Sequence, residues 1–124
     1  MQQFKKFCLI GGGGFIVDSL CFIFFSHLTN NIMLARLLSF WVAATVTWLG
    51  NRIYTYKQHQ NNAFYQWCKH MLTAHFSGCI NLLVFWSVKG ITITAVAFVI
   101  GIFVSLFINF FLANRFVFVT THSK

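Results

Sequence analysis

The chain has 124 residues, of which 58% are hydrophobic, 19% aromatic and only 8% charged. A soluble domain usually carries about 25% charged residues, and soluble monomers seldom expose large contiguous apolar patches. The composition therefore excludes an ordinary water-soluble enzyme, a disordered tail and a disulfide-stapled secreted module, and it indicates an integral membrane protein.

Four apolar runs are long enough to cross a bilayer, because a helix needs about 20 mostly apolar residues to span the hydrocarbon core. These runs are continuous, whereas the strands of a membrane barrel alternate apolar and polar residues. We therefore predict an all-α integral membrane protein that forms a single membrane domain over residues 1–124. The expected transmembrane helices cover residues 7–28, 34–54, 67–88 and 91–113, with short connections at residues 29–31, 56–62 and 89–90.

Positive charges fall unequally on the two sides of these expected helices. Cytoplasmic segments of membrane proteins carry an excess of Lys and Arg, so we expect both termini and the central connection to be cytoplasmic. The same bias, with attraction to anionic lipid, accounts for the net charge of +8, and we expect no nucleic-acid partner. The cytoplasmic set is Lys5, Lys6, Arg52, Lys57, Lys69, Arg115 and Lys124, and the opposite set is Arg36 and Lys89.

The four cysteines lie inside expected helices at spacings that match no metal motif. Cysteine in an apolar helix usually behaves as a small hydrophobic residue. We therefore expect neither a metal site nor a cofactor.

The two halves of the sequence resemble each other. The segment 4–8 is similar to 64–68, and Asn51-Arg52 with its following aromatics is similar to Asn114-Arg115 with its own. Each half contains two expected helices, so both halves would have the same membrane orientation. The sequence thus predicts two helical hairpins related as a parallel repeat.

Asp18 is the only carboxylate side chain in the sequence, and it lies near the middle of the first expected helix. An ionisable residue at membrane depth is expensive and indicates function by default. The sequence leaves two readings open: a neutral group that hydrogen-bonds a neighbouring helix, or a charged group paired with Arg36, Arg52 or Arg115.

Two further groups of polar residues have alternative interpretations. Asn81 and Asn109 lie deep in the third and fourth runs, where an amide serves either helix packing or substrate contact. Arg52 and Arg115 either anchor helix ends by reaching the membrane surface or bind a phosphate with their guanidinium groups.

These residues resemble the GtrA-like family of small four-helix membrane proteins over about residues 4–119. Residues 7–12 running to Asp18 match the opening of the family, with Phe15 where Thr is usual. The fourth run ends in a similar Asn-Arg-aromatic pattern, although Ala113 replaces Asn and Arg115 is displaced by one residue. The second run keeps Asn51-Arg52 but has Thr47 in place of the earlier Asn.

The resemblance implies a non-enzymatic flippase in the bacterial cytoplasmic (inner) membrane. Its substrate would be a polyprenyl-phosphate-linked monosaccharide, typically on undecaprenyl phosphate, moved to the outer leaflet for cell-surface polysaccharide, lipopolysaccharide, lipid A or teichoic acid. Expected phosphate-binding residues are Arg52, Arg115 and Arg36, and the expected polar path for the sugar contains Asp18, Asn51, Asn81, Asn109, Asn114 and Trp48.

Two other functions remain open at this level. One is a small multidrug-type cation exporter that uses an acidic residue in its first helix, and the other is a non-transporting anchor or partner of a membrane glycosyltransferase. Because four short helices leave little room for a complete cleft, we also expect a homo-oligomer.

Overall fold

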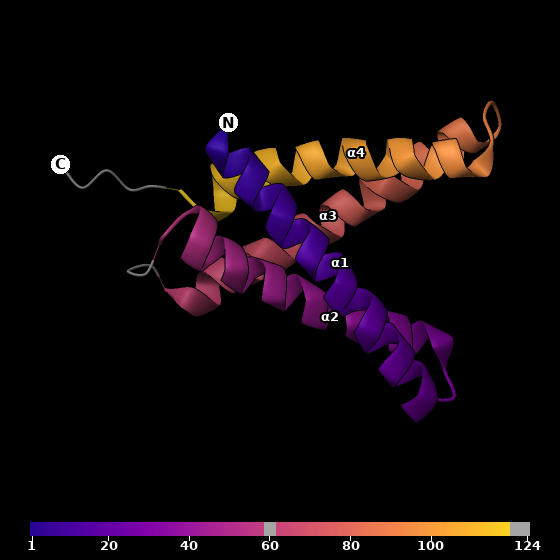
Figure 1. Cartoon of the computed structure of the whole chain (residues 1–124), viewed down its shortest axis with the longest axis horizontal. Coiled ribbons are helices and arrows are strands. Elements are labelled where there is room, and N and C mark those ends of the chain that lie inside the picture. Colours follow the sequence, from indigo (N-terminus) through magenta and orange to yellow (C-terminus); the bar gives the residue numbers. More distant parts are fainter. Residues whose placement is uncertain (59–61, 120–124) are drawn as a thin grey trace. The chain divides into compact units, whose positions relative to one another are not determined.

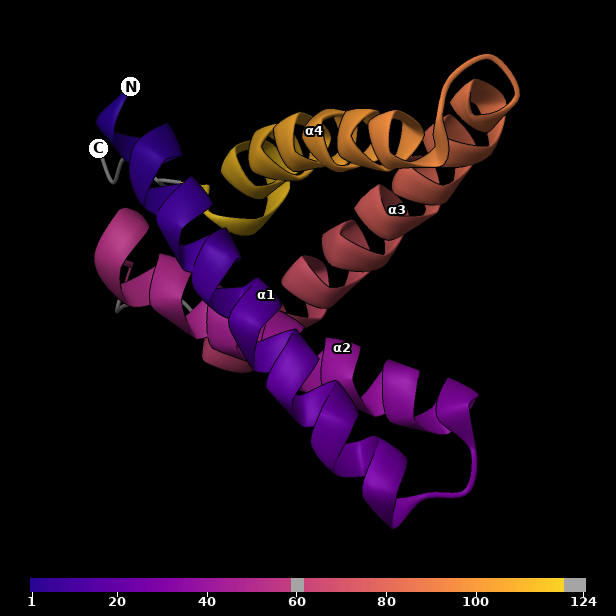
Figure 2. The same cartoon turned by 45° about the vertical axis from the view of Figure 1, so that its right-hand side comes forward.

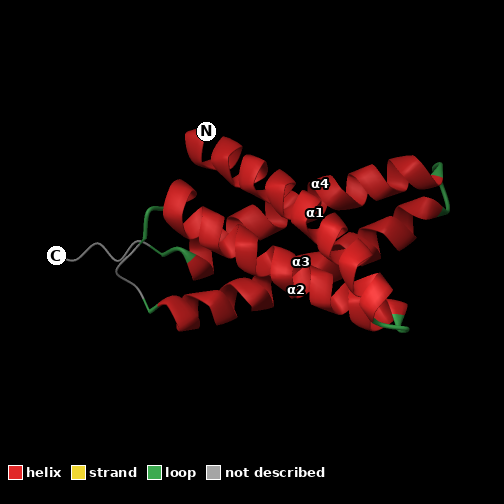
Figure 3. Cartoon of the chain, turned by 60° about the horizontal axis from the view of Figure 1, so that its bottom comes forward, coloured by secondary structure: helices red, strands yellow, loops and turns green. Residues whose placement is uncertain are grey.

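The computed structural model describes residues 1–58 and 62–119. Part of the expected 56–62 connection, and Lys124 among the expected cytoplasmic charges, lie outside the described residues. All regular elements within the described residues are helices (Figure 3).

The chain folds as two helical hairpins. The first hairpin contains α1 (Gln2–Leu28), α2 (Ile32–Gly50) and the π-helical turn η1 (Asn51–Thr55) (Figure 1). The second hairpin contains α3 (Ala63–Lys89), α4 (Thr94–Leu112) and the π-helical turn η2 (Ala113–Val117) (Figure 2). The prediction of an all-helical protein with four long apolar helices in two hairpins is confirmed.

Four helices of the described chain are long and apolar enough to cross a membrane, and η1 and η2 extend two of them. The helices begin and end beyond several of the expected runs; α1, for example, begins at Gln2 rather than at residue 7. A helix can continue past the apolar run, since Lys5 and Lys6 are themselves good helix formers. Large apolar side chains are exposed along all four helices, as a lipid-facing surface requires.

Inter-residue contacts divide the chain into two compact units, Met1–Trp67 and Cys68–Lys124. In the first unit, α1 and α2 pack where small residues allow their backbones to approach. A Cβ atom at Gly14 would collide with the Cγ2 methyl of Thr47, and one at Gly50 would lie 2.9 Å from Cγ2 of Ile10. The neighbouring glycines 11–13 have open space instead, so only Gly14 of the glycine run sets the helix spacing.

The second unit uses the same device between α3 and α4. A Cβ atom at Gly101 would collide with the side-chain oxygen of Asn81 and lie 3.1 Å from its backbone oxygen. Gly101 and Ala97 are both buried. The α3–α4 hairpin therefore has a close approach at Gly101 that an added Cβ atom would disturb.

The two hairpins share element lengths. Both α1 and α3 have 27 residues, both α2 and α4 have 19, and both π turns have 5. The π turns close alike: Tyr56 N donates to Asn51 O at 2.9 Å, and Phe118 N donates to Ala113 O at 2.8 Å. Asn51 therefore corresponds to Ala113.

Candidate functional site

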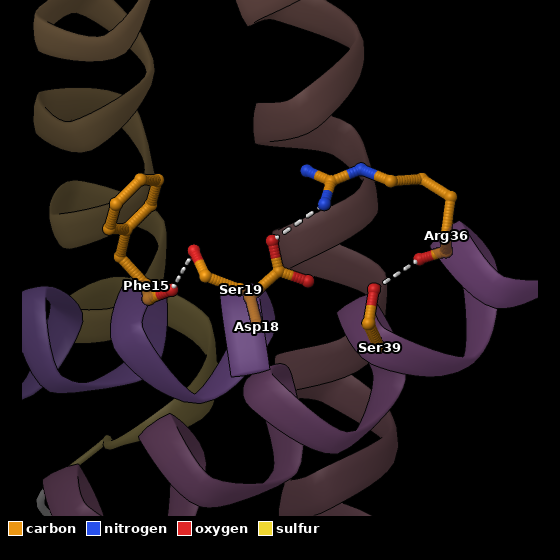
Figure 4. Close-up of polar contacts among 5 residues, drawn as sticks. All are labelled: Phe15, Asp18, Ser19, Arg36 and Ser39. Atoms are coloured by element: carbon orange, nitrogen blue, oxygen red, sulfur yellow. Dashed lines mark hydrogen bonds and ion pairs between the residues drawn. The ribbon is translucent and has the colours of Figure 1, made fainter. Parts of the chain in front are cut away.

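Asp18 pairs with Arg36 across the first hairpin. The Nη1 atom of Arg36 lies 3.0 Å from Oδ2 of Asp18, and Figure 4 shows the guanidinium reaching from α2 to the carboxylate on α1. Of the three partners left open by the sequence, the structure selects Arg36. Asp18 is thus bound to Arg36 within this hairpin.

The two members of the pair differ in exposure. The Asp18 side chain is 13% exposed and the Arg36 side chain 57%. Arg36 also lies over the ring of Phe22, at 5.4 Å from its centroid. Only one carboxylate oxygen is used, and within the described residues Oδ1 of Asp18 is buried without a hydrogen-bond partner. The pair therefore has a buried carboxylate oxygen without a hydrogen-bond partner on one side and an accessible guanidinium on the other.

Local packing positions this pair. Gly14 lies one helical turn before Asp18 and brings α1 against Thr47 of α2. Ser39 is fully buried and donates to the backbone oxygen of Arg36 at 2.9 Å (Figure 4). Close helix packing, rather than flexible loops, holds the carboxylate and the guanidinium together.

Arg52 forms a buried polar cluster at the other end of α2. Its side chain is 8% exposed, and Nη1 donates to Oε1 of Gln66 at 2.6 Å. Gln66 in turn donates to Oε1 of Gln58 at 3.0 Å. The guanidinium of Arg52 is thus buried and hydrogen-bonded to a side-chain amide.

Trp48 lies next to this cluster. The guanidinium of Arg52 lies over its indole ring at 5.7 Å. The Nε1 donor of Trp48 is buried and has no hydrogen-bond partner within the described residues. A buried donor without a partner is costly, so this atom is available to an acceptor that enters the site.

Asn51 is a structural neighbour of Arg52. It is 2% exposed, and its Oδ1 accepts a hydrogen bond from Thr55 at 2.9 Å. With its backbone oxygen bonded to Tyr56, Asn51 fixes the π turn that carries Arg52. Such π turns occur frequently at functional sites.

The second hairpin holds the remaining expected residues. Oγ of Ser77 donates to Oδ1 of Asn109 at 3.4 Å, and Asn81 lies against Gly101, so α3 and α4 share a polar interface. In η2, Arg115 is exposed and Asn114 is half-buried. Since Ala113 corresponds to Asn51, the counterpart of Arg52 is Asn114 and not Arg115.

Sequence reasoning missed a buried polar face on α3. Four of its polar side chains are at most 8% exposed and recur three or four residues apart, which places them on one face of the helix. That spacing was the signal that could have revealed them. They are Gln66, His70, Thr73 and Ser77.

Among residues 1–58 and 62–119, no group of three or more His, Cys, Asp or Glu side chains is placed to hold a metal ion. Outside the candidate spans, burial raises the pKa of Tyr56 above its ordinary value. The polar groups of the first hairpin described above are the guanidinium groups of Arg36 and Arg52, the carboxylate of Asp18 and the indole of Trp48.

Fold and site together define a small multi-pass helical membrane protein with charged groups held between its first two helices. The chain belongs to the family described as GtrA/DPMS, transmembrane domain, whose model matches residues 6–122. No curated protein matches the chain. GtrA proteins are generally non-catalytic membrane proteins associated with the translocation of polyprenyl-linked sugars, in agreement with the resemblance seen in the sequence.

Proposed function

We propose that this protein is a flippase that moves a polyprenyl-phosphate-linked monosaccharide, typically on undecaprenyl phosphate, from the cytoplasmic to the outer leaflet. It would act in the bacterial cytoplasmic membrane, with both termini cytoplasmic, and supply sugars to cell-surface polysaccharide, lipopolysaccharide, lipid A or teichoic acid. Family membership supports the lipid-linked sugar as the class of substrate.

The observation that carries this proposal is the buried guanidinium of Arg52. Its side chain is 8% exposed, its Gln66 contact is with a neutral amide, and the only carboxylate side chain in the sequence, Asp18, is bound to Arg36. Burial strengthens the attraction of a guanidinium for an anion, because the local dielectric is low. A lipid phosphodiester is such an anion, and the guanidinium geometry suits phosphate oxygens.

In this proposal the phosphate is taken up near Arg52, with Arg115 attracting it at the membrane surface, and it reaches Arg36 at the outer side. Trp48 stacks on the sugar or donates its free Nε1 hydrogen to it. The remaining polar contacts to sugar hydroxyl groups would come from Asp18, Asn51, Asn81, Asn109 and Asn114.

The test is flipping of a short-chain polyprenyl phosphoglucose in liposomes that contain only the purified protein. Gln66→Glu is the informative variant, because it places a carboxylate where Arg52 now donates at 2.6 Å. The new ion pair should retain the fold and reduce flipping at least about tenfold, because the internal carboxylate competes with the phosphate for the same guanidinium.

The matched control is Gln3→Glu, which adds the same charge at an exposed position and should flip the lipid at the wild-type rate. Unchanged flipping by Gln66→Glu would refute the role of Arg52. No flipping by the wild-type protein would refute the proposed function itself.

An anchor or partner of a membrane glycosyltransferase is the second candidate. The family description, GtrA/DPMS transmembrane domain, places GtrA together with a second kind of protein. This shared membrane domain supports a role as a membrane-embedded partner. Flipping in liposomes that lack any glycosyltransferase would exclude this role as the sole function.

The same preparation tests our proposal of a homo-oligomer, through crosslinking in the bilayer and the mass of the crosslinked species.

Cation export has less support. An exporter of that type would use Asp18 to bind a cationic substrate, but Arg36 of the same chain already occupies one of its oxygens at 3.0 Å. A drug-resistance assay with the wild-type protein and Asp18→Asn would reveal this activity directly.

A further inference from the structure

The outer face of α3 differs from that of α4. Between residues 96 and 112, every exposed side chain of α4 is apolar, as contact with lipid requires. The exposed face of α3 instead carries His75, which lies near the middle of this helix. Ionisable side chains at membrane depth almost always face protein or water rather than lipid. The position of His75 therefore indicates that a further protein surface covers this face.

His75 belongs to a stripe of exposed residues that suits pairing with a second helix. These residues recur alternately four and three positions apart, which is the spacing of the contact seam between two supercoiled helices. Copies of one protein insert into the membrane in the same orientation. A two-fold axis along the membrane normal therefore pairs α3 with a parallel α3 and places identical residues opposite each other. The stripe contains Cys68, Leu72, His75, Cys79, Leu82 and Trp86.

We infer that His75 and Cys79 of two copies bind one Zn²⁺ ion between their α3 helices. Both side chains are exposed, the thiol of Cys79 is free, and the two residues are one turn apart, about 6 Å along the helix. Pairs of ligands on one helix bind zinc at this spacing. This zinc site goes beyond the proposed flippase activity and does not depend on it, and it gives the proposed homo-oligomer an interface.

The site is incomplete without the second copy. In the part of the chain that the structure describes, one copy holds no group of three or more His, Cys, Asp or Glu side chains placed around an ion. A structural zinc site needs four ligands, and two copies supply two imidazoles and two thiolates. The cysteine spacings behind our expectation of no metal site concern one chain only and leave this pairing untested.

A hydrogen bond within α3 prepares His75 as a ligand. Nδ1 of His75 lies 2.7 Å from the backbone oxygen of Met71, and because a carbonyl oxygen only accepts, Nδ1 carries the proton. In the neutral ring the lone pair is then on Nε2. Metal-binding histidines almost always donate their other ring N–H to a carboxylate, a backbone oxygen or water, which fixes the ring for coordination. His75 has this supporting bond within its own helix.

The charge of the complete site suits its depth in the membrane. Each Cys79 thiol loses its proton when it binds the ion, so two thiolates and two neutral imidazoles bring the charge of Zn²⁺ to zero. A neutral site avoids the cost of a charge at membrane depth. A tetrahedral set of two sulfur and two nitrogen ligands is also typical of zinc.

The test uses the full-length protein in detergent, stripped with EDTA and titrated with Zn²⁺ or with Co²⁺ as a spectroscopic probe. We expect one ion per two chains, more dimer by light scattering when Zn²⁺ is present, and the thiolate-to-cobalt charge-transfer absorption of a tetrahedral site. His75→Ala and Cys79→Ala should each weaken Co²⁺ binding by at least about tenfold, because even the loss of a residue that only supports a ligand has an effect of that size. Each should also abolish the response of the dimer to Zn²⁺.

Cys68→Ala is the matched control. Cys68 lies on the same exposed stripe but seven residues before His75, which is about 10 Å along the helix. That distance is too long for the thiol to share the ion. This variant should bind Co²⁺ with the wild-type affinity and show the same charge-transfer absorption.

Equal Co²⁺ affinity in the wild-type protein and Cys79→Ala, or a bound ion without the charge-transfer absorption, would overturn the zinc site. A dimer that forms equally with and without Zn²⁺ would also overturn it, while leaving the proposed homo-oligomer intact. If Cys79→Ala fails to fold, Cys79→Ser preserves the size of the side chain and must show the same loss. None of these measurements uses a lipid-linked sugar, so the flippase proposal is tested separately.

Discussion

Replacing Gly14 by Ala tests whether the close approach of α1 and α2 positions the Asp18–Arg36 pair. The added methyl group would occupy the same space as Cγ2 of Thr47 and would lie 3.6 Å from its Cβ and 3.8 Å from the backbone oxygen of Ala43. Because Gly14 precedes Asp18 by one turn, separating the helices here also moves the carboxylate away from its partner.

The expected magnitude follows from two opposing terms. Ala in place of Gly inside a helix gains about 0.5–1 kcal/mol, while an extra methyl group in a closely packed contact costs about 1–3 kcal/mol. Gly12→Ala is the matched control, because a Cβ atom there meets nothing within 4 Å. Gly12→Ala should gain only the stability that Ala adds over Gly inside a helix. We expect Gly14→Ala to be less stable than Gly12→Ala by about 2 kcal/mol.

The assay is equilibrium unfolding in mixed micelles, followed by circular dichroism and tryptophan fluorescence. A second change, Thr47→Ser, removes the colliding methyl group and keeps the hydroxyl that donates to the backbone oxygen of Ala44 at 2.9 Å. The double variant Gly14→Ala/Thr47→Ser should recover at least about 1 kcal/mol of unfolding free energy, measured as a coupling energy. Equal stability of the Gly14 and Gly12 variants, or no recovery with Thr47→Ser, would refute the packing explanation.

Three further predictions concern other parts of the chain. Gly101→Ala should destabilise the α3–α4 hairpin by about 1–3 kcal/mol in the same unfolding assay, since its Cβ atom meets a backbone oxygen at 3.1 Å, whereas Gly78→Ala has open space and should not. Burial raises the pKa of Tyr56 above 10.0. The contribution of the neutral phenol to the free energy of unfolding is therefore complete below that pH and is lost as the pH rises further. Tyr56→Phe should make the free energy of unfolding less sensitive to pH above about 10. Arg52→Gln should weaken phosphoglucose lipid binding at least about tenfold at any salt concentration, whereas the smaller loss from the exposed Arg115→Gln should vanish at high salt; equal salt dependence of the two would contradict the difference in burial.

Hydropathy was sufficient to predict the helices and their pairing into hairpins. The length of each apolar run can be counted directly from the sequence. The connections at Thr29 and Lys89 are so short that consecutive helices have to lie antiparallel. The glycine run was less informative, because sequence periodicity does not show which of several adjacent glycines faces the neighbouring helix. Gly14 was distinguished from its neighbours only by the contact with Thr47.

The partner of Asp18 and the environment of Arg52 could not be derived from sequence. Three arginines were available to Asp18, and the choice depends on how α2 is rotated against α1. The burial of Arg52 depends on Gln66, which lies at the start of α3 and enters the cluster only after the chain has turned back. A one-residue register difference in the π turns also concealed that Arg115 does not correspond to Arg52.

Comparison of the two hairpins separates the demands of folding from those of function. The helices have equal lengths in both, both end in a π turn, and the second positions of these turns carry Arg52 and Asn114. At equivalent positions of the helices, Asp18 and Arg36 of the first hairpin correspond to Cys79 and Phe98 of the second.

The same hairpin architecture therefore forms with neutral side chains at all three charged positions. The charges are not needed to build a hairpin of this kind, and a charged side chain at the centre of a membrane-spanning helix is unfavourable by about 2.5–3.5 kcal/mol. A group that the fold does not need and the membrane penalises is explained by what it binds. In the proposed function that ligand is the anionic lipid phosphodiester, because the first hairpin holds the guanidinium groups of Arg36 and Arg52 and its one carboxylate, Asp18, is bound to Arg36.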